Sequence, residues 1–455
     1  MNSTLERFQI IGLHGRKTVD VVIKENTLVL VGENGSGKTT FLRILFHFLS
    51  GRWLSLVQFR FNSIVATIGG NEYRISHDDL VKAFKGVDRR FLAEIPPPLR
   101  RRVMELLEKG DLERVAIELE RAGGRYSIPP EVLLRQLEFF EIPARGAKKE
   151  LQETITRIQD AIQAQVLYLP TYRRIERELS SIFEGVDPDD FRRHRNRLRQ
   201  NESGEAYIEL VEFGMKDVEQ AVDRTLERLK EFARESLNNL TLRYLGDVVN
   251  REYQNVGMKE IADVSEDTVR AVLDRIHESI LTKTHKDHLF GVINSARSAD
   301  APTEHEKIIY HYFLKLLGFQ QSLQQNEQQI SAFCDLCSEY IVDKRFLYDS
   351  QTFSFSIVPT GLLQADRSIT LSDLSSGEKQ IVSLFSHLYL SGQRNFFVLI
   401  DEPELSLSVP WQRRFLQDIR AGKFCKGLVA VTHSPFIYDN NLRTHTHSLG
   451  EFVSF

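Results

Sequence analysis

Runs of consecutive apolar residues near both ends of the chain predict strands that are buried on both faces. Residues 27–31 read TLVLV, residues 396–400 read FFVLI and residues 427–431 read GLVAV. Strands of a parallel sheet covered by helices show such unbroken runs, whereas half-exposed strands alternate apolar and polar positions. The segment TTFLRILFHFL, which follows the first run, has helical spacing. These patterns predict a parallel α/β sheet assembled from the two ends of the chain.

The residues between these ends predict additions to that sheet. Apolar and polar residues alternate along residues 59–77 on both sides of Gly69-Gly70, which predicts an antiparallel hairpin with a two-residue turn. A further strand is predicted at residues 166–169, just before Pro170. Residues 78–165 combine helical spacing with heavy charge and are broken by proline runs, so they predict an inserted helical subdomain.

A long helical arm is predicted in the second half of the chain. Apolar residues recur there at three- and four-residue steps, as on one face of a long helix: Val218, Val222, Leu226, Leu229 and Ala233. A second helical run over residues 304–343 could pair with it as an antiparallel arm, with a loop at residues 295–306 near the far end. The expected fold class is α/β: a parallel sheet with helices, an antiparallel β subdomain and a large inserted helical or coiled-coil arm.

Composition narrows the class of protein. The chain has 455 residues, 42% apolar and 27% charged, which is typical of globular domains. It has no run of 18 or more apolar residues, so no membrane partner is expected. The start lacks the pattern of a secretory signal and there are only three cysteines, so we expect a cytoplasmic location. The net charge of −4 argues against nucleic acid coating the whole surface but leaves local basic patches open.

Cys334 and Cys337 form a CxxC pair inside a predicted helix. We interpret them as core residues, because no second pair follows. Metal or redox chemistry is the alternative.

The turn after the first apolar run has the pattern of a phosphate-binding loop, Gly32-x-x-x-x-Gly37-Lys38-Thr39. Its glycines let backbone N–H groups point at phosphate oxygens, and the following helix presents its positive end to them. Lys38 would neutralise phosphate charge, and the Thr39 hydroxyl would bind Mg²⁺. The alternative is a glycine-rich turn that matches by chance, which the strand before it and the helix after it disfavour. The predicted ATP-binding residues here are Gly32, Glu33, Asn34, Gly35, Ser36, Gly37, Lys38, Thr39 and Thr40.

Asp401 and Glu402 follow the apolar run at residues 396–400. A buried strand would deliver Asp401 to the carboxyl edge of the sheet, where it can hold Mg²⁺ through water. Glu402, one residue on, can polarise an attacking water molecule as a general base. An apolar strand with an acidic turn would be the structural alternative if this stretch stood alone.

Two further segments complete a series of motifs. The segment LSSGEK, which contains Ser375, Ser376, Gly377 and Glu378, precedes an amphipathic helix and predicts a second anion-binding helix start. The run at residues 427–431 is followed by Thr432-His433-Ser434, and His433 at a strand end could sense a γ-phosphate through a hydrogen bond.

In this order and spacing, the phosphate loop, LSSGE, VLIDEP and VTHS resemble the motifs of ABC-type ATPases. The chain is similar to the branch that contains RecF, SMC and OLD-family proteins with an AAA ATPase domain. The segment DEPELSLSVPWQRRF is closer to the OLD-like group, which usually has histidine where Ser408 stands. The resemblance covers residues 5–76 and 341–455. It implies that two protomers sandwich ATP and Mg²⁺, with Ser375 to Gly377 of one closing on the Lys38 loop of the other and residues 406–408 at the dimer seam.

One feature of these ATPases has no clear counterpart, a glutamine after a strand that contacts Mg²⁺ and the attacking water. After the predicted strand at residues 166–169 the chain reads Thr171-Tyr172-Arg173 instead. Gln58 is an alternative, but it lies early and within a predicted strand. The resemblance therefore implies slow hydrolysis, or ATP acting mainly as a conformational ligand.

Together these patterns predict five segments. Residues 1–76 form the N-terminal part of the ATPase head, and residues 77–165 form the inserted helical subdomain. Residues 166–176 contribute a strand and loop to the head, and residues 177–340 form the arm. Residues 341–455 form the C-terminal part of the head, with the signature segment, Asp401 and His433.

The sequence after His433 leaves no room for the TOPRIM nuclease domain that OLD-family nucleases carry there. We therefore expect this ATPase to act through a second protein, as in two-gene phage-defence systems. The segments LYLPTYRRIE and VEFGMKDVE resemble PARIS-type ATPase subunits, with Septu-type subunits as the second choice. This resemblance implies a homo-oligomer, from a dimer up to a hexamer, a separate TOPRIM-type nuclease as effector and a phage protein as trigger.

Two other classes of function remain open. A RecF-like DNA-repair ATPase would bind DNA tightly in the presence of ATP. The motor subunit of a membrane transporter is disfavoured by the large helical insertion and the missing glutamine. Five arginines within residues 192–199 could contact nucleic acid, although a solvated or acid-paired helix face is the more common role of such a run.

Overall fold

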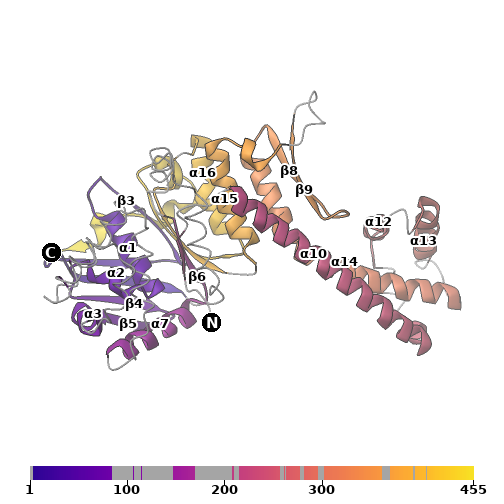
Figure 1. Ribbon diagram of the computed structural model, residues 1–455, viewed down its shortest axis with the longest axis horizontal. Helices are drawn as coiled ribbons and strands as arrows, with labels where there is room; N and C mark the ends of the chain where they lie inside the picture. The colour runs from indigo at the N-terminus through magenta and orange to yellow at the C-terminus, as the bar shows by residue number, and fades with distance from the viewer. Residues whose placement is uncertain are drawn as a thin grey trace. The chain divides into compact units, whose positions relative to one another are not determined.

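The chain folds into two compact units, Met1–Glu212 with Gln393–Phe455, and Phe213–Gly392. Their elements are shown in Figure 1. The computed structural model describes residues 4–84, 106, 114, 147–169, 207–209, 215–256, 261, 263–276, 281–295, 302–360, 369–392, 395–405 and 407–455.

A six-stranded parallel sheet forms the centre of the first unit. Every position of β10 is buried, and β11 exposes only Lys426, which explains why their sequences are unbroken apolar runs. The strands predicted from the apolar runs near both ends of the chain and at residues 166–169 are confirmed. The order of strands is β12 (Thr446–Ser448), β3 (Thr27–Val31), β11 (Cys425–Val431), β10 (Phe396–Asp401), β6 (Gln165–Leu169) and β7 (Tyr207–Glu209).

A five-stranded antiparallel sheet accompanies it in the same unit. Its last two strands form the predicted hairpin, with Gly69 and Gly70 at the turn. Both glycines have positive φ, 57° and 79°, which a two-residue hairpin turn requires. The order of strands is β13 (Val453–Ser454), β2 (Lys17–Val22), β1 (Leu5–Leu13), β4 (Ser63–Ile68) and β5 (Asn71–Ser76).

Helix α1 (Lys38–Ser50) packs against both sheets. The ring of Phe8 in β1 lies 5.7 Å from that of Phe41 and 5.5 Å from that of Phe48. The ring of Phe46 stacks on Tyr168 of β6 at 4.6 Å. A helix enclosed in this way is buried on most of its circumference, which accounts for the aromatic and aliphatic run that follows the phosphate loop.

Further helices complete the first unit. They are α2 (Trp53–Val57), α3 (His77–Phe84), α7 (Ala147–Ile162), α16 (Val409–Ala421), α17 (Pro435–Tyr438), η5 (Asn441–His445) and η6 (Leu449–Phe452). The strand predicted around Gln58 is wrong. Gln58 is the last, capping residue of α2, and its side-chain amide donates to the carbonyl oxygen of Ser55 at 2.8 Å. A short helical turn between apolar segments reads like a strand because both bury consecutive apolar residues.

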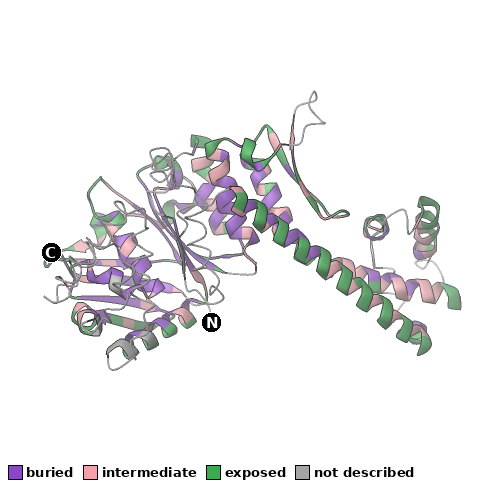
Figure 2. Cartoon of the chain, in the orientation of Figure 1, coloured by how far each residue is buried: buried purple, intermediate pink, exposed green. Residues whose placement is uncertain are grey.

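The second unit contains the predicted arm, built from α10 (Met215–Val249) and α14 (Glu304–Tyr340). Tyr244 and Asp247 near the end of α10 bond to residues near the start of α14, so the helices run antiparallel as predicted (Figure 1). Val218, Val222, Leu226 and Leu229 are buried as expected, and Ala233 is partly buried. The outer part of α10 exposes most of its surface (Figure 2). The second helix ends at Tyr340, slightly earlier than predicted.

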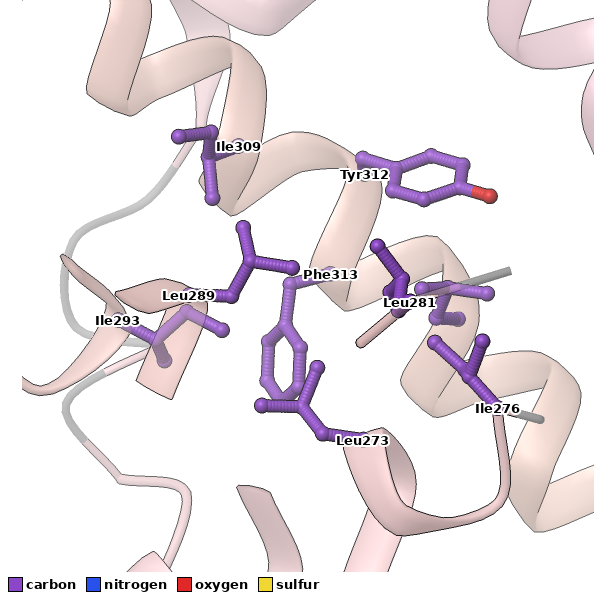
Figure 3. Close-up of a pocket in the computed structure, with 9 residues that line it drawn as sticks. Leu273, Ile276, Leu281, Leu289, Ile293, Ile309, Tyr312 and Phe313 are labelled. Carbon is purple, nitrogen blue, oxygen red and sulfur yellow. The ribbon is translucent and has the colours of Figure 1, made fainter. Parts of the chain in front are cut away.

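Helices α12 (Glu266–Asp274) and α13 (Lys283–Ser295) form a small core with α14. Phe313 lies at its centre, facing Leu273 and Leu289 in Figure 3. A cavity of about 40 Å³ is lined by Leu273, Ile276, Leu281, Leu289, Ile293, Ile309, Tyr312, Phe313 and Leu316. The other elements of this unit are η3 (Glu252–Asn255), β8 (Lys344–Asp349), β9 (Ser354–Pro359), η4 (Leu371–Asp373) and α15 (Ser376–Leu390).

Cys334 and Cys337 are both buried in α14, in agreement with the interpretation as core residues. Burial raises the pKa of the Cys334 thiol to about 12 and that of Cys337 well above its ordinary value. Both are therefore neutral thiols at physiological pH.

The expected fold class is confirmed by the parallel sheet, the antiparallel sheet and the long helical insertion. The second unit begins at Phe213, within the predicted arm, and runs on to Gly392, so it includes the signature segment. The five-segment division itself stays a prediction. Three features lie outside the described residues: the arginine cluster at 192–199, the segment 171–173 and most of the subdomain predicted at 78–165.

No helix among the described residues is long and apolar enough to cross a membrane.

A buried ion pair fixes the arm to the rest of its unit. Glu327 in α14 is only 3% exposed. Its carboxylate accepts a hydrogen bond from the Arg275 guanidinium at 2.5 Å and a second from the Tyr348 hydroxyl of β8 at 2.9 Å. We predict that Glu327→Ala lowers the free energy of unfolding by about 3 kcal/mol, because it leaves the Arg275 side chain, which is 18% exposed, without its counter-charge. Denaturant unfolding followed by circular dichroism would measure the change.

The control for this variant is Glu231→Ala, which removes an exposed ion pair with Arg234 on α10. We expect it to cost about 0.5 kcal/mol or less. Equal effects of the two variants would contradict the assignment of a structural role to Glu327.

Candidate nucleotide-binding site

The phosphate loop connects the end of β3 to the start of α1. Gly32, Gly35 and Gly37 have φ values of 146°, 81° and 97°, a region that side-chain-bearing residues rarely adopt. A Cβ added at Gly32 would lie only 3.3 Å from the Ser36 hydroxyl. The loop therefore depends on glycine for its shape, as the sequence motif predicts.

Lys38 occupies the centre of this loop. Its ammonium group donates to the carbonyl oxygens of Gly32 and Glu33, both at 2.8 Å, and lies 3.3 Å from the Ser36 hydroxyl. The residue is only 4% exposed, and this burial lowers the pKa of Lys38, while Glu402, Asp401 and Glu404 act in the opposite direction. The loop thus holds a buried cation beside the positive end of a helix, an arrangement suited to a phosphate group.

Thr39 meets Asp401 from the far end of the sequence. The Thr39 hydroxyl donates to Asp401 Oδ1 at 3.2 Å, although the residues are 362 positions apart. Asp401 is the last residue of β10 and is 1% exposed. A hydroxyl and a carboxylate are hard oxygen ligands of the kind that Mg²⁺ accepts, and Mg²⁺ usually takes only one or two protein ligands and keeps several waters. The residues present therefore fit this ion.

Glu402 has an unusual backbone conformation for its type, with φ at 49°. Its N–H donates to the carbonyl oxygen of Val431 at 2.8 Å, so the turn after β10 is attached to the end of β11. Burial raises the pKa of Glu402, and the negative charges of Asp401 and Glu404 raise it further. Backbone strain and a carboxylate with raised proton affinity often occur together at sites of proton transfer.

His433 lies two residues beyond β11, and its side chain is exposed. Its backbone N–H donates to Glu404 Oε1 at 2.7 Å. The charges of His433 and Lys38 both act on Glu402 to lower its pKa, which places these three groups in one electrostatic neighbourhood. The structure thus brings together Lys38, Thr39, Asp401, Glu402 and His433.

The signature residues belong to the other unit. Ser375 caps helix α15 and forms a reciprocal capping box with Glu378, as the small hydroxyl residues before this helix predict. Ser375 and Ser376 are exposed, whereas Glu378 is buried and pairs with Lys344 at 2.9 Å. The Glu378 carboxylate is thus bonded within the unit, where it shapes the start of the helix.

Two residues of these hydrogen-bond networks were not predicted from the sequence. Glu404 lies in the turn after β10, and Lys344 begins β8. Both are charged residues in a chain rich in them, and their partners lie about 30 positions away. Glu404 directly follows the Asp-Glu-Pro segment, but nothing local to it indicates the backbone groups that it accepts. Ser406 lies outside the described residues, and Ser408 is exposed at the start of α16.

The Lys344–Glu378 pair predicts a pH-dependent contribution to stability. Burial acts to raise the pKa of Glu378, but the bonds from Lys344 and Ser375 outweigh it, so the pKa lies below the ordinary 4.5. The stabilisation is therefore present above that value and is lost as the pH falls through the lower, folded-state pKa. We expect Glu378→Gln to cost about 1–3 kcal/mol of unfolding free energy at pH 7, and the difference from the unmodified protein to shrink in acid. A difference that stays constant with pH would contradict this assignment.

For Glu402 we expect the opposite dependence of stability on pH. Its pKa is raised in the fold, so its ionised form is disfavoured there and the protein gains stability as Glu402 becomes protonated. Glu402→Gln should therefore keep or raise the midpoint of thermal unfolding at pH 7, measured in EDTA without nucleotide. Glu404→Ala is the matched comparison, since it removes an accepting carboxylate nearby and should lower the midpoint. A clear loss of stability in Glu402→Gln would contradict the assignment.

Comparison with known proteins places these motifs in a family. No curated protein matches the chain significantly. Among solved structures, the chain is similar to an SMC head domain from Pyrococcus furiosus, which has an extended coiled coil and is bound to the C-terminal domain of ScpA. The two chains share 12% sequence identity, with a TM-score of 0.32. That alignment covers 96% of this chain and 92% of the other. A family model described as "AAA domain, putative AbiEii toxin, Type IV TA system" matches residues 28–439. Because this match spans most of the chain, from the phosphate loop past His433, the chain belongs to that AAA-domain family.

Proposed function

We propose that the chain is an ATP-hydrolysing sensor and scaffold subunit of an anti-phage defence complex, and that it controls a separate nuclease effector. The observation that supports the ATPase part most strongly is the bond between Thr39 and Asp401 beside the buried Lys38. It joins a phosphate loop to a strand-end carboxylate from the opposite end of the sequence, and membership of an AAA-domain family agrees with it.

The residues of the site have distinct roles in this proposal. Lys38 and the loop N–H groups bind the β- and γ-phosphates of ATP. Thr39 and Asp401 would hold Mg²⁺, which would supply positive charge to neutralise the phosphates. Glu402 accepts a proton from the attacking water as the general base, and its raised pKa favours that acceptance. His433 donates a hydrogen bond to the γ-phosphate.

A second copy of the chain would complete the site. Ser375 and Ser376 are exposed at the start of α15, where helix N–H groups and hydroxyls are available to phosphate oxygens. The resemblance to ABC-type ATPases supports the closing of this segment on the phosphate loop of another protomer. ATP would then act as the link between subunits, whether or not hydrolysis is fast.

The proposal of a defence role rests on the likeness of the segment after Asp401 to OLD-type ATPases and on the family description, which names a toxin–antitoxin system. The arm offers a surface for a partner protein. Leu242, Leu245 and Val249 near the end of α10 are 69%, 56% and 81% exposed. Their spacing places them along one side of the helix, and apolar side chains grouped in this way are typical of protein interfaces.

We predict that Lys38→Ala weakens ATP binding by about 100-fold, because the variant loses a charged donor to the phosphates, a bond worth up to about 3 kcal/mol. Isothermal titration calorimetry would measure the affinity. Lys24→Ala, which removes an exposed lysine from the same unit, should leave it unchanged. Unchanged affinity in Lys38→Ala would overturn the assignment of the site.

Glu402→Gln should bind ATP but hydrolyse it poorly, so that an ATP-bound oligomer accumulates. We would purify the tagged variant from its native host with ATP and Mg²⁺ and identify the proteins that co-purify by mass spectrometry. A stoichiometric nuclease would support the defence role. Duplex DNA together with recombination proteins, and no nuclease, would favour the RecF-like alternative. A variant that hydrolyses ATP at the unmodified rate would contradict the role of Glu402 as base.

A further inference from the structure

The Glu404 carboxylate accepts three hydrogen bonds from consecutive residues that follow β11. Its Oε2 accepts from the Thr432 hydroxyl at 2.7 Å, and its Oε1 accepts from the backbone N–H groups of His433 at 2.7 Å and Ser434 at 3.2 Å. Thr432 is fully buried. The carboxylate is therefore bonded on both oxygens to one short segment, residues 432–434, through one side-chain hydroxyl and two main-chain N–H groups.

This segment leaves the sheet at the point where Glu404 meets it. The Thr432 N–H still donates to the carbonyl oxygen of Leu30 in β3, which continues the sheet pattern. The next two N–H groups bond to Glu404 instead of to a neighbouring strand, and that of Ser434 also donates to the Thr432 hydroxyl at 3.0 Å. Because each peptide N–H is a strong donor, an acceptor that takes two in succession fixes the direction in which the chain leaves the strand. Glu404 thus fixes the main chain that carries the His433 side chain.

Gln412 in α16 extends the same network. Its Oε1 accepts from the Ser434 hydroxyl at 2.7 Å, and its Nε2 donates to the Leu407 carbonyl oxygen at 2.9 Å. The turn after β10, the start of α16 and the turn after β11 are thereby joined through side chains. Glu402 is also attached to this assembly, since its N–H bonds to Val431.

We propose that Glu404 is a positioning residue for ATP hydrolysis, which holds the turn bearing His433 in register with the turn bearing Glu402. This inference rests on the proposed ATPase function. Glu404 acts through the main chain of His433 and does not touch the phosphates. A displacement of about 1 Å at a reacting group can cost about 100-fold in rate. A fixed distance between the two turns therefore favours a carboxylate at position 404, even in a site that binds an anion.

The test compares Glu404→Ala with Glu404→Gln in the full chain. Alanine removes all three bonds, whereas glutamine keeps one oxygen for the two N–H groups and presents an amide to the Thr432 hydroxyl, which can accept as well as donate. We expect Glu404→Ala to lower kcat about 10- to 100-fold while the affinity for ATP stays within about threefold. Glu404→Gln should recover most of the rate. Asp439→Ala, which removes a 73%-exposed carboxylate just after α17, should leave the rate unchanged.

Two further measurements separate positioning from a general structural role. The His433→Ala change should lower kcat by a smaller factor in the Glu404→Ala variant than in the unmodified protein. The reason is that both changes remove the contribution of the same imidazole to the rate. Hydrogen–deuterium exchange followed by mass spectrometry should show faster exchange of the segment around residues 432–434 in Glu404→Ala, with the phosphate loop unchanged. If Glu404→Ala does not fold, Thr432→Val removes the hydroxyl that bonds to Glu404 Oε2 and should lower kcat by a smaller factor of about three to ten.

Several outcomes would overturn the proposal. These are an unchanged kcat in Glu404→Ala or in its substitute Thr432→Val, a loss of ATP affinity equal to the loss of rate, and fully additive effects with His433→Ala. If the unmodified protein neither binds nor hydrolyses ATP, the proposed function fails and the kinetic role of Glu404 fails with it. A protein that binds and hydrolyses ATP, and whose Glu404→Ala variant does so equally well, would overturn the role of Glu404 alone.

Discussion

The parallel pairing of β11 with β3 on one side and β10 on the other is the constraint on which the site depends. Val431 of β11 pairs with Leu30 of β3 and with Asp401 of β10, so strands from the two ends of the sequence end at the same level. Each strand is followed by a turn that carries polar groups: the phosphate loop, Glu402 with Glu404, and His433. Because parallel strands present their carboxyl ends at one edge of a sheet, a shift of register by one residue would separate Thr39 from Asp401.

Helix α1 keeps that edge fixed. Phe41 and Phe48 pack on Phe8 of the antiparallel sheet, and Phe46 stacks on Tyr168 of the parallel sheet. The helix that begins at Lys38 is therefore enclosed by apolar contacts along its length, while its first turn faces the loop. This burial allows the structure to hold an ammonium group inside a backbone loop, since the desolvation of Lys38 is offset by carbonyl oxygens and by nearby carboxylates.

The carboxylates of the site have different environments. Asp401 accepts from the Thr39 hydroxyl, and Glu404 accepts from three groups of residues 432–434. Glu402 has its pKa raised by burial and by the other two carboxylates. In the second unit Glu378 has the opposite shift, because Lys344 and the start of α15 favour its charged form. Glu402 and Glu378 are the same residue type, so their environments decide the opposite directions in which their pKa values shift.

The sequence by itself determined the buried strands β3, β6, β10 and β11, the β4–β5 hairpin, the phosphate loop and the arm, because each of these depends on local pattern. Unbroken apolar runs predict β3, β10 and β11, glycine spacing predicts the loop, and three- and four-residue steps predict α10. Local pattern misled at Gln58, where a short buried helix has the apolar content of a strand. Only the tertiary structure decided that Glu404 bonds to residues 432–434 and that Lys344 pairs with Glu378. Charged residues are common along the chain, and their partners are selected by strand register and helix packing, which bring together groups that no local pattern connects.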